Sequence, residues 1–129
     1  MIGGVVRVCC ALALGKHWNV LLSVRKGHRL VTSGPYSVVR HPSYTGYLLQ
    51  YVGLIVVHGS QESWMRESGV LQIPFVKVLA AIYFSLLTMF SVLAIQRPAM
   101  EDKMLHEALG EEWESWAKEV KYRLLPGVY

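Results

Sequence analysis

Two long stretches with almost no charge constrain the fold of this chain most strongly. Residues 42–61 contain no Asp, Glu, Lys or Arg, and residues 75–96 contain one charge, Lys77, close to one end. A helix needs about 20 predominantly apolar residues to cross the hydrocarbon core of a bilayer. Lys77 stands where its side chain can reach the membrane interface. The two stretches therefore predict a transmembrane helical hairpin, joined by an exposed polar loop over residues 60–74.

The composition agrees with a membrane protein. The chain is 53% hydrophobic and 17% charged, whereas an average soluble domain is about 25% charged. The net charge is +4 and the pI is about 9.2, but the sequence contains no recognition motif for nucleic acid. Between residues 16 and 40 the charged residues are all basic, which is typical of a cytosolic loop between membrane helices. These residues are Lys16, Arg25, Lys26, Arg29 and Arg40.

Further helices are expected on both sides of the hairpin. Residues 2–14 are apolar apart from Arg7 and are too short to span. We interpret them as a partial helix of a chain truncated at its N-terminus, because Arg7 and the missing basic head argue against a signal peptide. Residues 97–120 show an amphipathic helical pattern, which Gly110 is expected to break. The whole chain, 1–129, is thus predicted to be one all-α integral membrane domain.

The sequence gives no sign of a metal centre or a disulfide framework. Cys9 and Cys10 are neighbours in an apolar run, and the five His residues show no zinc-binding spacing. No Gly-x-Gly loop follows a strand, so a Rossmann cofactor site has no support either.

A hairpin would bring two polar groups to the same membrane interface. Arg40 and His41 directly precede the first span, and Arg97, Glu101 and Asp102 follow the second. Arg97 and Glu101 share a helix face, and the simplest interpretation is a local salt bridge worth a few tenths of a kcal/mol. The alternative is a pocket beside the lipid, with a cation, a carboxylate and an imidazole. Such a pocket suits a small zwitterion and an amphiphile with an anionic head.

Two blocks of the sequence resemble the isoprenylcysteine carboxyl methyltransferase family. They are HRLVTSGPYSVVRHPSYTG, residues 28–46, and RPAMEDKMLHEALGEEWESWAKEVKYRLLPGV, residues 97–128. The family consists of multi-pass enzymes of the endoplasmic reticulum membrane. They transfer a methyl group from S-adenosyl-L-methionine to the C-terminal α-carboxylate of a prenylated cysteine. The resemblance implies that prenylated CaaX-type proteins, after proteolysis, are the partners. It also implies that residues 15–41 and 97–129 lie on the cytosolic side.

The resemblance also implies roles for particular residues. Arg97 matches the family's substrate-contacting, catalytic arginine. The acceptor carboxylate is already ionised at neutral pH, so no strong general base is required. Catalysis can come from holding its oxygen in line with the methyl carbon and from excluding water. The implied cofactor-binding residues are His28, Arg29, Leu30, Val31, Tyr36, His41, Pro42, Ser43, Tyr44 and Glu101.

Three other functions remain open from the sequence. Phospholipid N-methyltransferases share the membrane architecture, although an amine acceptor would make less use of Arg97. NADPH-dependent sterol reductases carry strings similar to RHPSY. A non-catalytic membrane fragment is the third alternative, because the first helix is short and residues 18–25 show no match to the family pattern. The choice between farnesyl and geranylgeranyl substrates cannot be made from these residues.

Overall fold

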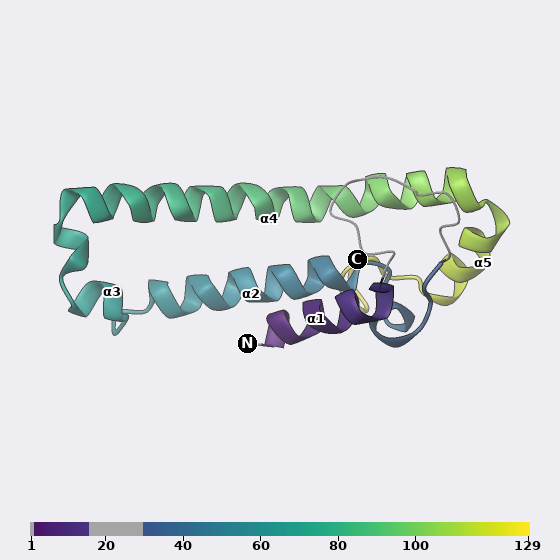
Figure 1. Cartoon of the computed structure of the whole chain (residues 1–129), viewed down its shortest axis with the longest axis horizontal. Helices are drawn as coiled ribbons and strands as arrows, with labels where there is room; N and C mark the ends of the chain where they lie inside the picture. The colour runs from purple at the N-terminus through teal and green to yellow at the C-terminus, as the bar shows by residue number, and fades with distance from the viewer. Residues whose placement is uncertain (1, 16–29) are drawn as a thin grey trace.

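The described part of the chain is helical. The structure is a computed structural model that describes residues 2–15 and 30–129 (Figure 1). Within these residues there is no β-strand, which confirms the all-α prediction for this part of the chain. The elements in chain order are α1 (Ile2–Leu14), η2 (Gly34–Ser37), α2 (Pro42–Gly59), α3 (Trp64–Glu67), η3 (Val70–Gln72), α4 (Pro74–Leu109) and α5 (Glu111–Glu119).

Helix α4 is the longest element. Its 36 residues extend roughly 54 Å at 1.5 Å per residue, which exceeds the roughly 30 Å of a bilayer core. Among the described residues it is the one helix long and apolar enough to cross a membrane, and 11% of its most apolar stretch is buried. The expected apolar helix over residues 75–96 therefore forms the first part of α4, and the remaining turns can project beyond the hydrocarbon.

The expectation of a separate amphipathic helix from residue 97 to residue 120 is wrong. Helix α4 continues through Pro98, which is fully buried, and ends at Leu109. A proline removes one backbone hydrogen bond, but the strong helix formers after it continue the helix. Gly110 does break the helix as predicted, because it adopts a φ of +55° that favours glycine. Helix α5 is the short amphipathic helix that follows.

Helix α2 runs antiparallel beside α4 (Figure 1). Pro42 occupies its first turn, where the missing N–H costs no hydrogen bond. The hydroxyl of Tyr47 donates to the carbonyl of Leu87 at 3.3 Å, and the hydroxyls of Tyr51 and Thr88 are 3.0 Å apart. The uncharged residues 42–61 are thus helical almost throughout. Whether α2 also crosses a membrane stays a prediction.

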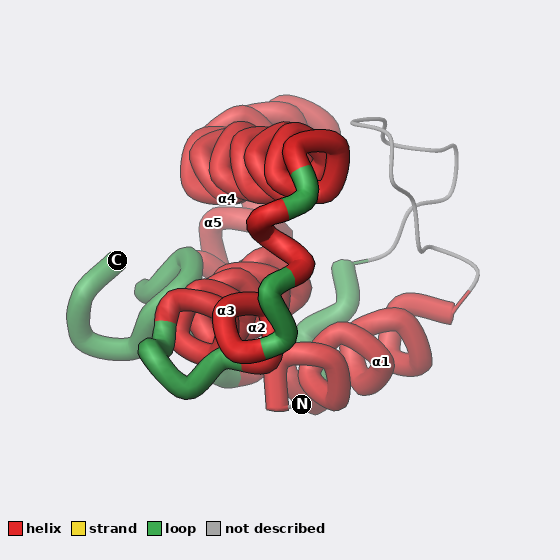
Figure 2. The backbone as a smooth tube through the Cα atoms, turned by 90° about the vertical axis from the view of Figure 1, so that its left-hand side faces the viewer, coloured by secondary structure: helices red, strands yellow, loops and turns green. Residues whose placement is uncertain are grey.

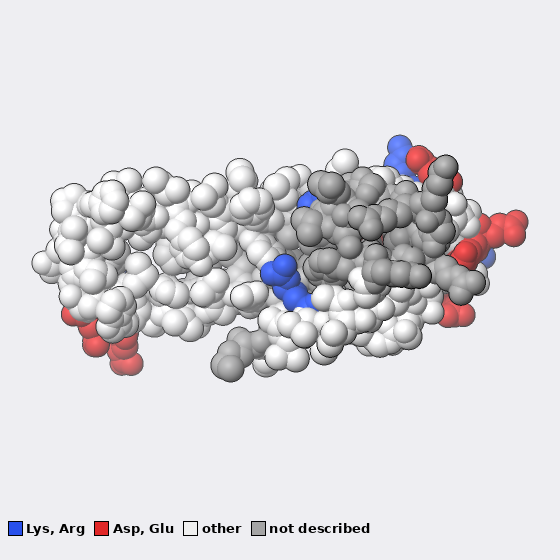
Figure 3. Space-filling model, in the orientation of Figure 1, with Lys and Arg blue, Asp and Glu red and all other residues white. Residues whose placement is uncertain are grey.

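The polar link between α2 and α4 is more ordered than the expected loop. Residues 60–74 contain the single turn α3 and the 3-10 turn η3. Gly69 separates these two turns with a φ of +70°. On the face shown in Figure 3, acidic side chains gather near this end of the molecule, and the neighbouring surface carries no Lys, Arg, Asp or Glu.

Helix α1 covers the bounds predicted for the partial helix and packs against α2 (Figures 1 and 2). The two helices approach most closely at Gly3 and Gly46. A Cβ atom added to Gly46 would lie 2.7 Å from the carbonyl oxygen of Gly3 and 2.9 Å from Cγ of Arg7. Small residues allow such close crossings of membrane helices. The bounds of α1 thus follow from the apolar run, and its position follows from two glycines.

The most buried side chains gather around the start of α2. After α5 the chain folds back, so the C-terminus lies close to the first turn of this helix (Figure 1). The other end of the molecule consists of helices whose large apolar side chains are exposed. The buried apolar side chains near the start of α2 are Tyr36, Val39, Trp116, Val120 and Leu124.

We expect Gly46→Ala to destabilise the protein by about 1–3 kcal/mol, because the new methyl group would overlap the backbone of α1. Gly53→Ala is the matched control on the same helix, since its Cβ would meet nothing within 4 Å. The control should be neutral or slightly stabilising. Unfolding in mixed micelles, followed by circular dichroism, measures both. Equal stability of the two variants would contradict the close crossing.

Candidate functional site

The C-terminal segment holds the start of α2 through its backbone. Four hydrogen bonds run to successive carbonyl groups of this segment. The donors are the backbone N–H groups of Arg40 and His41 and the side chains of Arg40 and Thr45. The acceptors are Lys121 for the Arg40 side chain at 3.0 Å, Tyr122 for the Arg40 N–H at 2.9 Å, Arg123 for the His41 N–H at 2.9 Å and Leu124 for the Thr45 hydroxyl at 2.6 Å. Residues 121–124 therefore fix the conformation in which Arg40 and His41 face α4.

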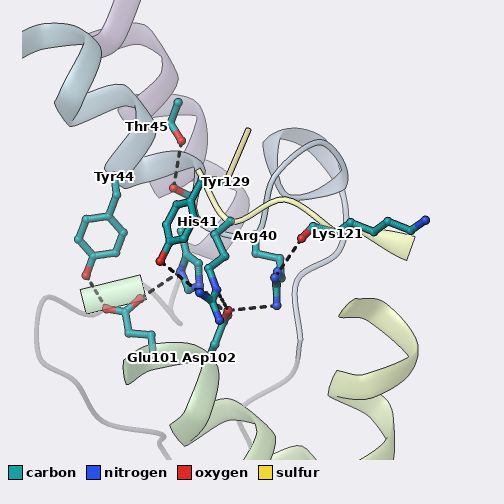
Figure 4. A network of polar contacts seen from close by, with 9 residues as sticks. Arg40, His41, Tyr44, Thr45, Glu101, Asp102, Lys121 and Tyr129 are labelled. Carbon is teal, nitrogen blue, oxygen red and sulfur yellow. Dashed lines mark hydrogen bonds and ion pairs between the residues drawn. The ribbon is translucent and has the colours of Figure 1, made fainter. Parts of the chain in front are cut away.

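Asp102 is the centre of the polar cluster (Figure 4). Its side chain is 4% exposed and interacts with three basic groups. Oδ2 lies 3.0 Å from Nη1 of Arg40 and 2.9 Å from Nε of Arg123, and Oδ1 lies 2.7 Å from Nε2 of His41. Tyr129 in turn holds Arg123, because its hydroxyl accepts from Nη1 at 3.1 Å. A buried carboxylate is tolerated only with such partners.

His41 lies between two carboxylates. Its Nε2 faces Asp102, and its Nδ1 lies 3.3 Å from Oε2 of Glu101. A neutral ring would direct one lone pair at a carboxylate, whereas an imidazolium donates at both nitrogens. Burial disfavours the charged ring, but the hydrogen bonds to Asp102 and Glu101 and their negative charges outweigh it and raise the pKa of His41. The two carboxylates therefore favour the imidazolium form of His41, which links them.

Glu101 is the more accessible of the two acids. Its side chain is 28% exposed, and its Oε1 accepts a short hydrogen bond from the hydroxyl of Tyr44. Tyr36 is buried nearby; burial raises its pKa, and Cys10 and the charge of Glu101 raise it further. The hydroxyl of Tyr44 thus faces Glu101, and the partly exposed carboxylate keeps room to accept from a ligand.

The ring of Trp113 on α5 lies over the guanidinium group of Arg40. The guanidinium carbon of Arg40 lies 5.6 Å from the centre of the Trp113 ring, a distance typical of a cation–π contact. Nε of Arg40 and the indole nitrogens of Trp113 and Trp116 are buried and have no hydrogen-bond partner among residues 2–15 and 30–129. All three groups are donors, and buried donors in proteins normally have an acceptor.

Comparison with known protein families shows to which family this chain is related. A sequence model of the isoprenylcysteine carboxyl methyltransferase family matches residues 1–107.

The chain belongs to this family.

Individual relatives of this member of the isoprenylcysteine carboxyl methyltransferase family include methyltransferases and sterol reductases. Protein-S-isoprenylcysteine O-methyltransferase of Xenopus laevis is 41% identical over 59 residues, which cover 44% of the chain and 20% of the relative. Protein-S-isoprenylcysteine O-methyltransferase B of Arabidopsis thaliana is 36% identical over 59 residues, which cover 44% of the chain and 30% of the relative. A Delta(14)-sterol reductase of Neurospora crassa is 29% identical over 129 residues, which cover 84% of the chain and 25% of the relative. The chain therefore spans less than a third of each relative. No solved structure gives a significant match.

The structure brings several of the predicted site residues together. Tyr36, His41, Tyr44 and Glu101 form part of one cluster. Arg97 is half-buried one turn before Glu101, and its charge acts on the phenol of Tyr44. Among the other predicted cofactor residues, Leu30, Val31 and Ser43 are half-buried and Pro42 is buried, whereas His28 and Arg29 lie outside the described residues.

Other members of the cluster are absent from the predicted site set. Arg40 and Asp102 are expected at the interface of the hairpin, but neither is among the predicted cofactor-binding or substrate-binding residues. Arg123 stands in the final block of the resemblance, but nothing in its neighbourhood distinguishes it from the other basic residues there. Its role follows only from the return of the C-terminal segment to α2.

We expect Asp102→Asn to destabilise the protein by about 3–5 kcal/mol, because three basic groups would lose the carboxylate that compensates them in a buried place. Glu107→Gln, an exposed change on the same helix, is the control and should leave stability unchanged. Detergent-based chemical unfolding compares the two. The central role of Asp102 is refuted if its variant is as stable as the control.

Stability should also depend on pH through His41. Because the folded pKa is raised, the contribution of His41 is fully present below the unfolded pKa of about 6.5 and is lost as pH rises through the folded pKa. The Tm of the native chain should therefore fall over this window, and His41→Gln should remove that part of the fall. Thermal unfolding over a pH series measures it, and an unchanged slope in the variant would contradict the assignment.

Proposed function

We propose that this protein transfers a methyl group from S-adenosyl-L-methionine to the C-terminal α-carboxylate of a prenylated cysteine. Membership of the isoprenylcysteine carboxyl methyltransferase family supports the reaction class. The observation that carries the proposal is the convergence of the two sequence blocks in one cluster. His41 of the first block lies between Glu101 and Asp102 of the second, at the end of an apolar helix.

The residues of the cluster fit the polar groups of this cofactor. Its ammonium and ribose hydroxyls need an acceptor, and Glu101 is partly exposed. Its carboxylate needs donors, and Nε of Arg40 and the indole nitrogen of Trp113 are buried donors without a partner among the described residues. The hydroxyl of Tyr36 would add a further donor, and Leu30 and Val31 would add apolar surface for the adenine. When bound, S-adenosylmethionine supplies an activated methyl group on its sulfonium sulfur.

The roles of the chain's own residues follow from their charge. The acceptor is a carboxylate and needs no base, which agrees with a His41 that is protonated and occupied at both nitrogens. Arg97 would hold the acceptor by a charge-assisted, bidentate pair and so orient the attacking oxygen. The aromatic side chains above Arg40 would exclude water from the reacting groups.

The arrangement of the helices supports a site at the membrane surface. The length of α4 allows its apolar part to span while Glu101 and Asp102 remain outside the hydrocarbon. The residues of the cluster come from the start of α2, the end of α4 and the C-terminal segment, as expected if residues 15–41 and 97–129 share the cytosolic side. We place this site in a multi-pass protein of the endoplasmic reticulum membrane. Its proposed protein substrates are prenylated CaaX-type proteins after proteolysis.

Sterol reduction is the second candidate. A Delta(14)-sterol reductase matches 84% of the chain, whereas the two methyltransferases match 44%. The methyltransferases are more similar over their shorter match, at 36% and 41% identity against 29%. A reductase would require a nicotinamide cofactor instead of a methyl donor. Phospholipid N-methylation would use the same methyl donor with an amine acceptor, for which Arg97 offers no partner.

Membranes that contain the protein should methylate a farnesylcysteine analogue when labelled S-adenosylmethionine is supplied. Arg97→Lys should lower kcat/KM for the acceptor roughly tenfold or more, because an ammonium cannot form the bidentate pair. Glu101→Gln should instead raise the KM for the cofactor. Both measurements use initial rates at varied concentrations of each substrate.

The controls separate the competing functions. Lys103→Gln, an exposed change on α4, should keep wild-type rates. Methylation of phosphatidylethanolamine without methylation of the farnesylcysteine analogue would replace the proposed acceptor. NADPH-dependent reduction of a Δ14-sterol in the absence of methylation would replace the reaction itself.

A further inference from the structure

Arg7 is a cation for which the chain provides no carboxylate. It is the one charged residue of α1, whose other residues are apolar or small. Among residues 2–15 and 30–129, no carboxylate forms an ion pair with it. The sequence from 16 to 29 contains neither Asp nor Glu. This cation is therefore available to a negative group from outside the chain.

The side chain of Arg7 is held in a defined place at the crossing of α1 and α2. Its Cγ packs where Gly46 leaves room for it, 2.9 Å from the position that a Cβ would occupy. Its guanidinium carbon lies 5.8 Å from the centre of the Tyr47 ring. The hydroxyl of Tyr47 is bound in turn to the carbonyl of Leu87 on α4. The charge is thus positioned by three helices, and the side chain is half-buried.

If α2 crosses the membrane as predicted, the depth of Arg7 corresponds to the headgroup region of a bilayer. Gly46 and Tyr47 follow Pro42 by four and five residues, which is roughly 6–8 Å along α2. Pro42 adjoins the charged cluster of His41 and Asp102, which would lie outside the hydrocarbon. An arginine about one helical turn below that level can reach the lipid phosphates with its long side chain.

We propose that Arg7 binds the phosphate group of a membrane phospholipid at the crossing of α1 and α2. A guanidinium matches a phosphate by two parallel hydrogen bonds, and the stacked Tyr47 ring keeps the guanidinium oriented. Exposed apolar side chains of the neighbouring helices, among them Ile2, Val5 and Val52, offer surface for the acyl chains. This lipid site is independent of the methyl-transfer reaction proposed above.

Native mass spectrometry of the detergent-solubilised chain tests the proposal. The probes are dioleoylphosphatidylglycerol and dioleoylglycerol, which share acyl chains and differ in the phosphate-containing headgroup. Arg7→Met keeps the stem that packs on Gly46 and removes the charge. We expect it to weaken binding of the phospholipid roughly fivefold or more and to leave binding of dioleoylglycerol unchanged. Arg7→Lys should retain part of the affinity, since a point charge still attracts phosphate.

Arg66→Met is the matched control, because it removes one exposed cation at the α3 end of the molecule. It should bind the phospholipid like the wild type. The proposal is overturned if Arg7→Met binds the phospholipid as strongly as the wild type. It is equally overturned if Arg7→Met loses both lipids alike, since that would report altered packing, or if the control loses as much affinity as Arg7→Met.

Discussion

The rest of the site depends on one buried carboxylate. Asp102 interacts with Arg40, His41 and Arg123, which come from the residues before α2 and from the C-terminal segment. A buried charge must be compensated, and here three separate basic groups are required to do so. This requirement joins segments that are far apart in the chain. The position of Glu101, the neighbouring residue on α4, is then fixed toward His41 and Tyr44.

The two ends of the molecule differ in the polarity and the burial of their side chains. Near the start of α2, buried polar groups and backbone pairing with residues 121–124 produce a specific, closely held arrangement. Toward α3, the apolar side chains of α2 and α4 remain exposed, which is appropriate for contact with lipid. The proposed site for a polar cofactor and a lipidated acceptor would need both environments next to each other. The length of α4 provides them on a single helix.

Much of the candidate site could be predicted because its residues stand in two compact blocks of sequence. His41, Tyr44 and Glu101 were expected at one interface, and the structure places them in contact. Arg123 could not be predicted as a member, because its contact with Asp102 spans 21 residues and a helix break at Gly110. The unpaired donors of Trp113 and Trp116 were equally hidden, since the pattern of α5 predicts an apolar face but no orientation of the indole rings.

The sequence alone determined that this chain is helical. It also determined the bounds of α1, the residues of the apolar part of α4 and the interruption of the last helical region at Gly110. Periodicity, hydropathy and the conformational freedom of glycine act over a few neighbouring residues, so they can be recognised without a fold. Only the tertiary structure decided that α4 continues beyond Pro98, that α1 crosses α2 at two glycines and that Asp102 collects its basic partners. These features depend on contacts between segments that are distant in the sequence. The energy of such contacts exceeds local conformational preferences, and the contacts leave no periodic signal in the sequence.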